Sequence, residues 1–178
     1  RDFSECENYR GINANMHSVE GLLAASAATG HLDLFERAAA IAERALTFAK
    51  GNGWFLPEHF TSEWEPRPSY NREEPAHPFR PYGATIGHSF EWARLALHIA
   101  AGFEGQFSDA TRATERASVL RDGALALAEK ACETWGIDGG GGFPYTVDWD
   151  GSPIVHERMH WVIAEAIGTA AVLFYSSG

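Results

Sequence analysis

The chain repeats one small pattern at a nearly constant interval. His17 and Glu20 stand three positions apart, and so do His88 and Glu91, each pair within a stretch rich in alanine and other small residues. A separation of three residues places both side chains on one face of a helix. A third histidine, His160, follows, and the three histidines are separated by 71 and 72 residues. This spacing predicts a structural repeat that brings its polar helix starts together.

Hydrophobic periodicity predicts helices that come in pairs. The expected helices cover about residues 13–29, 34–50, 88–101, 110–135 and 158–175. An apolar helix with many small residues alternates with an amphipathic, charged one. Such alternation is typical of an inner helix layer enclosed by an outer layer. We therefore expect an all-α fold, a toroid of helical hairpins, in which His17, His88 and His160 converge.

Two segments break the helical pattern. Residues 51–87 hold six prolines and several aromatic side chains, and long structured connections of this kind are commonly functional. Residues 143–147 and 154–155 have the composition of short strands on either side of Asp150 and Gly151. An Asp-Gly pair between such segments is a strong signal of a tight hairpin. The sequence thus predicts a helical domain with a short β-hairpin in a loop.

Charge and cysteine content exclude several classes of function. The chain has 14 basic and 24 acidic residues and a formal net charge of −10, which repels phosphate backbones and anionic lipid surfaces. We expect neither nucleic acid nor a membrane as a partner. Cys6 and Cys132 lie far apart without metal-ligand spacing, which favours a reduced, cytoplasmic protein.

His88 and Glu91 are the strongest candidates for chemistry. The positive end of a helix dipole lowers the pKa of a histidine, and an imidazole that is neutral near the working pH can act as a base. Glu91 lies in an otherwise nearly apolar helix, where a buried carboxylate needs a partner. The alternative role for His88 is a helix cap or a packing residue. Glu20 carries less weight than Glu91 because it is also compatible with an ordinary solvated position.

Aromatic residues indicate the kind of ligand. Trp161 and Glu165 are four positions apart and share a helix face, whereas His160 and Glu165 do not. The six tryptophans mostly indicate core packing, yet the faces of sugars also stack on aromatic rings. Trp, His and Glu side chains without lysine suit a neutral, polyhydroxylated ligand.

Three motifs carry a resemblance to a known family. They are YRGINANMH at residues 9–17, FRPYGATIGHSFEW at residues 79–92 and GFPYTVDWDG at residues 142–151. In these motifs, and over essentially the whole chain, the sequence resembles the N-acylglucosamine 2-epimerase superfamily, in particular its D-mannose isomerase branch. The resemblance implies an (α/α)6 barrel that interconverts sugars at C1 and C2 without a metal or redox cofactor.

The resemblance also implies roles for residues of the first two motifs. His88 matches one of two acid/base histidines, and Glu91 matches a residue that holds sugar hydroxyls and tunes that imidazole. Asn13 and His17 match positions that line the same pocket, where the histidine is also needed for activity. Arg80 matches a position in the loop before the catalytic helix.

The same resemblance extends to the last helix and beyond. Trp161 and Glu165 match a Trp-x-x-x-Glu pair at the pocket wall. The second acid/base histidine and an N-terminal arginine of the family have no match within residues 1–178. We therefore expect a single, incomplete (α/α)6-barrel domain over residues 1–178, lacking N-terminal and C-terminal portions and inactive in isolation.

The implied substrate is a neutral monosaccharide. Sulfosugar-isomerising relatives have an arginine where this chain has Pro78, and the loss of that cation argues against an anionic group at C6. The resemblance thus implies a sugar isomerase that interconverts mannose and fructose by His-mediated proton transfer through an enediolate. A 2-epimerase for a neutral sugar of the N-acylglucosamine or cellobiose type uses nearly the same residues and is the alternative.

Two other classes stay open at the level of sequence. A helical metal protein can use two His-x-x-Glu pairs as ligands, in the reverse order of known carboxylate-bridged sites. A non-catalytic carbohydrate-binding module also fits the aromatic content. Metal analysis and an assay of mannose conversion separate these classes.

Overall fold

The chain folds into five helices joined by loops and short strands. The computed structural model describes residues 4, 6–106 and 110–176, to which all structural statements refer. The helices are α1 (Ile12–Thr29), α2 (Leu32–Gly51), α3 (Ile86–Gln106), α4 (Ala110–Cys132) and α5 (His160–Ser176). Each expected helix is present, but α3 begins two residues earlier and extends further than expected. Within the described residues, no helix is both long and apolar enough to cross a bilayer.

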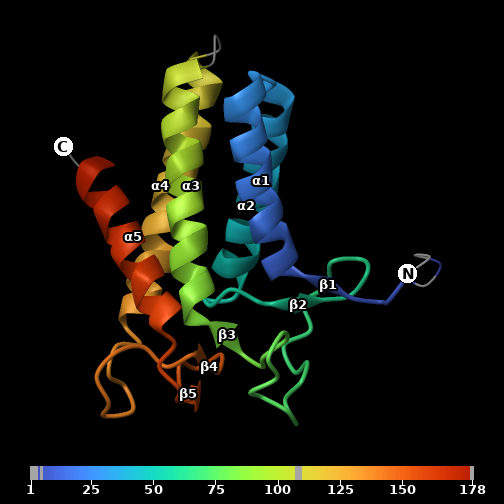
Figure 1. Ribbon diagram of the computed structural model, residues 1–178, viewed down its shortest axis with the longest axis vertical. Coiled ribbons are helices and arrows are strands. Elements are labelled where there is room, and N and C mark those ends of the chain that lie inside the picture. The colour runs from blue at the N-terminus through green and yellow to red at the C-terminus, as the bar shows by residue number, and fades with distance from the viewer. Residues whose placement is uncertain (1–3, 5, 107–109, 177–178) are drawn as a thin grey trace.

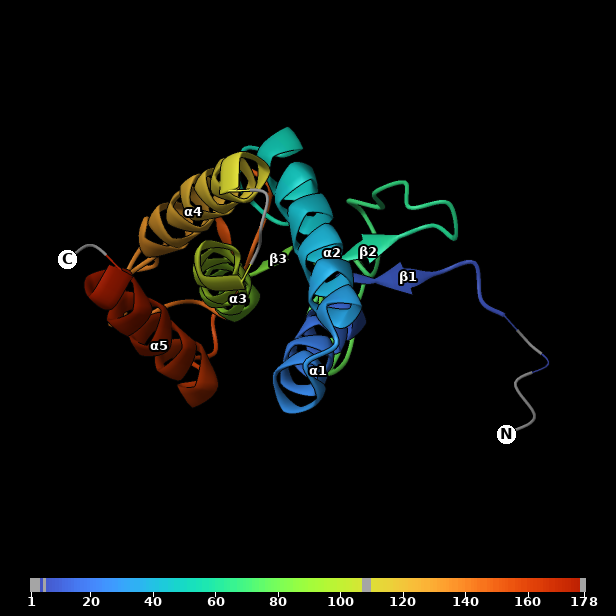
Figure 2. The same cartoon turned by 90° about the horizontal axis from the view of Figure 1, so that it is seen from above.

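The helices form two layers. In Figure 1, α1, α3 and α5 lie in front, and α2 and α4 lie behind them. Viewed from above, the first three form the concave side of an arc, with α3 between α1 and α5 (Figure 2). We call this concave side, formed by α1, α3 and α5, the inner face. The expected inner and outer layers are confirmed, and within the described residues they form an open arc.

A two-stranded sheet ties the start of α1 to the long loop after α2. Strand β1 (Arg10–Gly11) runs antiparallel to β2 (His59–Phe60), with Arg10 opposite Phe60. The backbone N–H of Ile12, the first residue of α1, donates to the carbonyl oxygen of Glu58 at 3.0 Å. This bond satisfies one of the amide groups that a helix start leaves unpaired.

A three-stranded sheet lies at the same end of the helices (Figure 1). It has the order β3 (Ala84–Thr85), β4 (Thr146–Val147) and β5 (Pro153–Val155), and both pairings are antiparallel. The expected hairpin is confirmed as β4–β5, and Gly151 in its loop has a φ of +89°. Since β3 runs directly into α3, this sheet fixes where α3 begins.

Helix α3 contacts every other helix of the described structure. Close packing of α3 against α2 depends on Gly102, because a Cβ atom there would stand 2.4 Å from the ring of Phe35. That ring is buried and makes an edge-to-face contact with Phe103 at 5.1 Å between centroids. The small residues of α3 therefore allow its neighbours to approach closely.

We expect Gly102→Ala to destabilise the fold by about 1–3 kcal/mol, because the added methyl group overpacks the buried site. The measurement is urea unfolding followed by tryptophan fluorescence. Gly21→Ala is the matched control, since Gly21 is an exposed position inside α1 with no atom within 4 Å of an added Cβ. That control should gain about 0.5–1 kcal/mol from helix propensity. Equal stability changes for the two variants would contradict the packing argument.

Candidate active site

His88 is held at the start of α3 by a carboxylate from the long loop. It is the third residue of α3, and 13% of its side chain is exposed. Its Nδ1 lies 3.0 and 3.1 Å from the two carboxylate oxygens of Glu58, whose side chain is 4% exposed. His88 Nδ1–H therefore donates to Glu58, and Nε2 makes no hydrogen bond within the described structure. This nitrogen is the one available to a ligand.

The charge environment of His88 corrects one expectation. Burial alone lowers the pKa of the imidazole, but the charge of Glu58, its hydrogen bond to Nδ1 and the charges of Glu91 and Glu165 together raise the pKa above its ordinary value. The expected lowering by the helix dipole is thus wrong in direction. The three carboxylates together outweigh the effect of burial.

Glu91 lies one turn further along α3. Its side chain is 9% exposed, and the closest cation-forming group is His17 Nδ1, 3.9 Å from Oε1. The carboxylate of Glu91 accepts no hydrogen bond within the described residues. Burial and the charge of Glu165 raise its pKa. A buried carboxylate without a hydrogen bond can accept one from a ligand hydroxyl or N–H group.

The first His-x-x-Glu pair behaves as its spacing predicts, and the second does not. His17 Nδ1 lies 2.8 Å from Glu20 Oε2 on the exposed side of α1. His88 is instead hydrogen-bonded to Glu58, while Glu91 on α3 lies opposite His17 on α1. The two pairs therefore meet, although they are 71 residues apart in the sequence.

Arg94 connects all three helices of the inner face, and the sequence reasoning missed it. Its Nε lies 3.0 Å from Oε2 of Glu165 on α5, and its guanidinium lies 3.7 Å from Oε1 of Glu20 on α1. The available signal was its position three residues after Glu91, as the only Lys or Arg in α3. Glu165, expected at the wall of the pocket, is accordingly paired with Arg94.

Trp161 covers the imidazole of His88. Their ring centroids are 5.6 Å apart with an interplanar angle of 39°, and Tyr145 packs edge-on against the indole at 6.1 Å. A Cβ atom at position 87 would stand 2.2 Å from the Trp161 ring. Gly87 is therefore needed for the indole to reach His88. Trp161 and Glu165 both contribute to the cluster, as their spacing predicts.

Asn13 and Arg80 make no hydrogen bond or ion pair with His88 or Glu91 within the described residues. Asn13 is exposed in the first turn of α1, four positions before His17 and on the same helix face. Arg80 lies over the ring of Tyr9 at 4.0 Å, and its guanidinium lies 3.0 Å from Tyr70 Oη and 3.0 Å from a Glu7 oxygen. Arg80 thus contacts Tyr9, Tyr70 and Glu7 and not His88 within the described residues.

His160 does not join the other two histidines. It is exposed and lines a separate pocket of about 260 Å³ with Trp135, Phe143 and Met159. The expected convergence of three histidines is wrong in this respect. Successive residues of a helix point about 100° apart, so turning Trp161 toward His88 turns His160 away.

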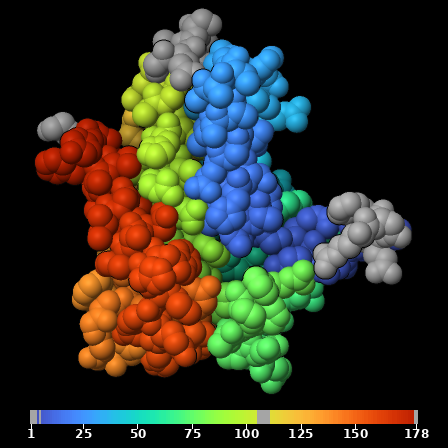
Figure 3. All heavy atoms as spheres, in the orientation of Figure 1, coloured from blue at the N-terminus to red at the C-terminus, as the bar shows by residue number. Residues whose placement is uncertain are grey.

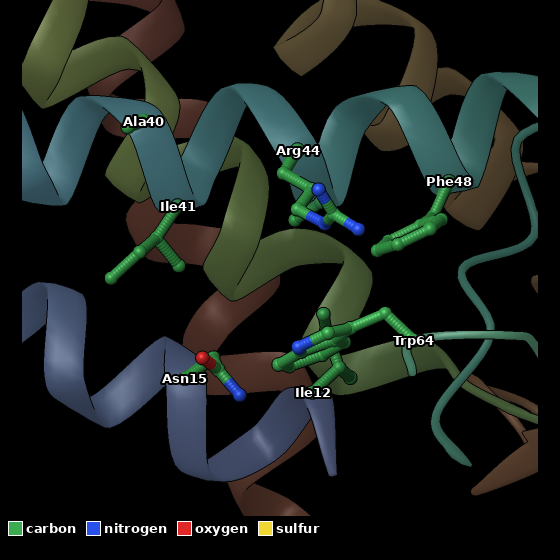
Figure 4. Close-up of a pocket in the computed structure, with 8 residues that line it drawn as sticks. Ile12, Asn15, Ala40, Ile41, Arg44, Phe48 and Trp64 are labelled. Carbon is green, nitrogen blue, oxygen red and sulfur yellow. The ribbon is translucent and has the colours of Figure 1, made fainter. Parts of the chain in front are cut away.

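A second pocket lies outside the inner face. It has a volume of about 420 Å³ and is formed between α1, α2 and the long loop (Figure 4). Its lining includes Ile12, Asn15, Ile41, Arg44, Phe48 and Trp64. The guanidinium of Arg44 lies over the Phe48 ring, 5.3 Å from its centroid, and makes a cation–π contact with it. This mostly apolar pocket contains none of the expected catalytic groups.

Glu58 is the other residue that the sequence reasoning missed. It lies 30 positions before His88 in an irregular loop, where no periodicity connects the two. The one available signal was the character of the loop from residue 51 to residue 87, which was expected to be functional.

Figure 3 views the inner face directly and shows α3 between α5 and α1.

One group of side chains has the composition of a metal site. One ligand atom each from His17, Glu20 and Glu91 lie within 4.8 Å of one another. Arg94, close to Glu20, places a competing cation beside this group. The cluster therefore combines the imidazole of His88, several carboxylates that can accept hydrogen bonds, the guanidinium of Arg94 and the indole of Trp161.

The paired helices in two layers, with a cluster of polar side chains on the inner face, define the chain as a protein built from α-helical hairpins. The whole chain, residues 1–178, matches the family model described as N-acylglucosamine 2-epimerase (GlcNAc 2-epimerase), and the chain belongs to that family. Among its relatives is the D-mannose isomerase of Thermobifida fusca, which is 46% identical over 173 residues, or 97% of this chain and 40% of the relative.

Two further comparisons agree with this assignment. The D-mannose isomerase of Pseudomonas cannabina pv. alisalensis is 44% identical over 182 residues, which cover 100% of this chain and 42% of the relative. A crystal structure of D-mannose isomerase superposes with a TM-score of 0.79 at 31% identity, covering 98% of this chain and 42% of that one. The chain spans about two fifths of the length of these relatives.

The raised pKa of His88 predicts how stability depends on pH. A pKa higher in the folded chain than in the unfolded chain means that protonation stabilises the fold. This contribution is complete below the unfolded value of about 6.5 and is lost as the pH rises through the folded value. We expect the stability advantage of the wild type over His88→Asn to be largest below about pH 6.5 and to fall as the pH rises through the raised pKa of the folded chain.

The measurement is urea unfolding of both proteins at several pH values. Asparagine is chosen because its amide retains a donor toward Glu58 without titrating. His160→Asn is the matched control on an exposed histidine. An advantage of the wild type that grows with pH would show that the sign is wrong.

Proposed function

We propose that this chain forms part of a sugar isomerase that interconverts mannose and fructose, with His88 as a proton-transfer group. The observation that carries the proposal is His88 itself, hydrogen-bonded to Glu58 through Nδ1 and without a hydrogen bond at Nε2 within the described residues, close to the buried carboxylate of Glu91. The D-mannose isomerase relatives support this choice of reaction.

The reaction needs a base that can both take and return a proton. Removal of the proton at C2 of open-chain mannose leaves an enediolate. Return of that proton to C1, with transfer of the O2 hydroxyl proton to O1, gives fructose. His88 Nε2 performs the transfer from C2 to C1 after the imidazole has lost its own proton. Return of the proton to C2 from the opposite face is instead a 2-epimerisation, so the product distinguishes the two reactions.

Glu91 supplies the acceptor that a sugar hydroxyl requires. Its carboxylate is buried without a hydrogen bond, so a hydroxyl donor offsets the cost of its burial. His17 adds a polar group 3.9 Å from it, and the Trp161 indole beside His88 offers a face for a sugar ring. Several carboxylates so close together disfavour an anionic substrate and favour a neutral one.

We also propose that the arc is a segment of a complete (α/α)6 barrel. Large apolar residues on α5 are exposed, among them Ile167, Phe174 and Tyr175. In a barrel, a further helix covers such a face, and the inner face becomes the wall of a closed pocket. The share of the relatives that this chain covers supports the same proposal.

We expect His88→Asn to abolish proton exchange at C2 of mannose when the complete protein is assayed. The measurement is NMR of mannose in deuterated water, which reports isomerisation, epimerisation or neither. Loss of a positioned general base typically costs a factor of about 10²–10⁴. His160→Asn, in the separate pocket, should retain wild-type exchange.

Three outcomes of that experiment would change the proposal. Wild-type exchange in His88→Asn would remove His88 from the mechanism. Exchange with an epimer as the product would assign a 2-epimerase. Binding of mannose without exchange in the wild-type protein would indicate a carbohydrate-binding module.

The group of His17, Glu20 and Glu91 favours one competing function, a metal site. We expect the purified protein to hold no stoichiometric transition metal and its exchange activity to survive a chelator, because Arg94 competes for Glu20. Elemental analysis and assays with and without EDTA test this. Activity that is lost on chelation and restored by one metal would favour the metal-dependent alternative.

A further inference from the structure

We propose that Glu58 is a positioning residue that fixes the tautomer and orientation of His88. Its carboxylate holds the proton of the neutral imidazole on Nδ1, which leaves the lone pair of Nε2 directed toward the inner face. The inference rests on the proposed role of His88 as a base. Without Glu58, a neutral imidazole can place its proton on either nitrogen.

The segment that carries Glu58 is anchored at two neighbouring points. Its carbonyl oxygen accepts the N–H of Ile12 at 3.0 Å, so the start of α1 holds it in place. The next residue, His59, is fixed through both ring nitrogens, with Tyr9 Oη at 2.9 Å from Nδ1 and the Pro81 carbonyl oxygen at 2.7 Å from Nε2. The carboxylate of Glu58 therefore projects from a rigid segment.

The carboxylate of Glu58 has His88 as its one hydrogen-bond partner within the described structure. Both of its oxygens lie at nearly equal distances from Nδ1, 3.0 and 3.1 Å. A carboxylate that is 4% exposed requires a donor. Since Nδ1–H is that donor, the protonated-Nε2 tautomer would leave a buried carboxylate facing a lone pair.

The other groups around His88 do not fix its tautomer. Glu91 lies on the same helix and Glu165 on α5, and both act on the imidazole through charge without a hydrogen bond to it. Trp161 and Tyr145 supply the aromatic wall, and the Trp161 ring lies tilted beside the imidazole with the centroids 5.6 Å apart. Among the residues that the structure describes, Glu58 is the group that hydrogen-bonds to the His88 ring, and it does so at Nδ1.

The test measures the ring nitrogens of His88 directly, in the chain with 15N-labelled histidine. Above the pKa of His88, we expect wild-type chemical shifts typical of a protonated Nδ1 and an unprotonated Nε2. In Glu58→Gln, the two tautomers should mix, and the titration midpoint should fall by about 1 pH unit or more because an opposite charge is lost. Glu58→Asp should retain the Nδ1-protonated tautomer.

Glu65→Gln is the matched control, since Glu65 is an exposed carboxylate of the same loop. It should leave both the tautomer and the midpoint of His88 unchanged. Circular dichroism shows whether each variant is folded. If Glu58→Gln does not fold, the wild-type spectrum still decides, because an Nε2-protonated wild-type imidazole overturns the inference. A folded Glu58→Gln protein with the wild-type tautomer and midpoint overturns it as well.

Kinetics of the complete protein separate this inference from the proposed function. Glu58→Gln should move the acidic limb of the kcat/KM profile to lower pH and reduce kcat about 10-fold or more. If the complete wild-type protein shows no proton exchange with mannose, the proposed function is wrong whatever the NMR tautomer is. If exchange is present and the profile of Glu58→Gln is unchanged, only the role of Glu58 is wrong.

Discussion

The enclosure of α3 by its neighbours governs the rest of the structure. Because the other four helices contact α3, its residues must be apolar or small, and any charge on it must find a partner. The helix has few charged residues, and two of them, Glu91 and Arg94, lie toward the inner face with groups of α1 and α5. Packing thus places these two charges of α3 on the inner face.

Local periodicity explains what the sequence could predict. The helix pairs, the two layers and the contact of His17 with Glu20 all follow from spacing within one helix. The hairpin of β4 and β5 follows from local turn chemistry at Asp150 and Gly151. Spacing and residue type also singled out His88 with Glu91 and Trp161 with Glu165, which lie together in the structure, while the resemblance added their expected roles.

Long-range contacts explain what the sequence could not predict. Glu58 reaches His88 from an irregular loop 30 residues away, so no repeat signals their contact. The direction of the His88 pKa shift depended on that contact, since burial lowers the pKa and the charges of Glu58, Glu91 and Glu165, with the hydrogen bond to Glu58, raise it. His160 failed to converge because packing of the neighbouring Trp161 toward His88 sets the rotation of α5.

The pairing of β1 with β2 makes the site sensitive to a part of the chain that contains none of its reactive groups. Arg10 and Gly11 are joined to the segment that carries Glu58, and Ile12 is bonded to Glu58 itself. A small displacement of α1 along its axis would therefore move the carbonyl group of Glu58 and, with it, the carboxylate that holds the imidazole of His88. The rigidity of the β1–β2 pair therefore bears on the position of the Glu58 carboxylate, and through it on the orientation of the His88 ring.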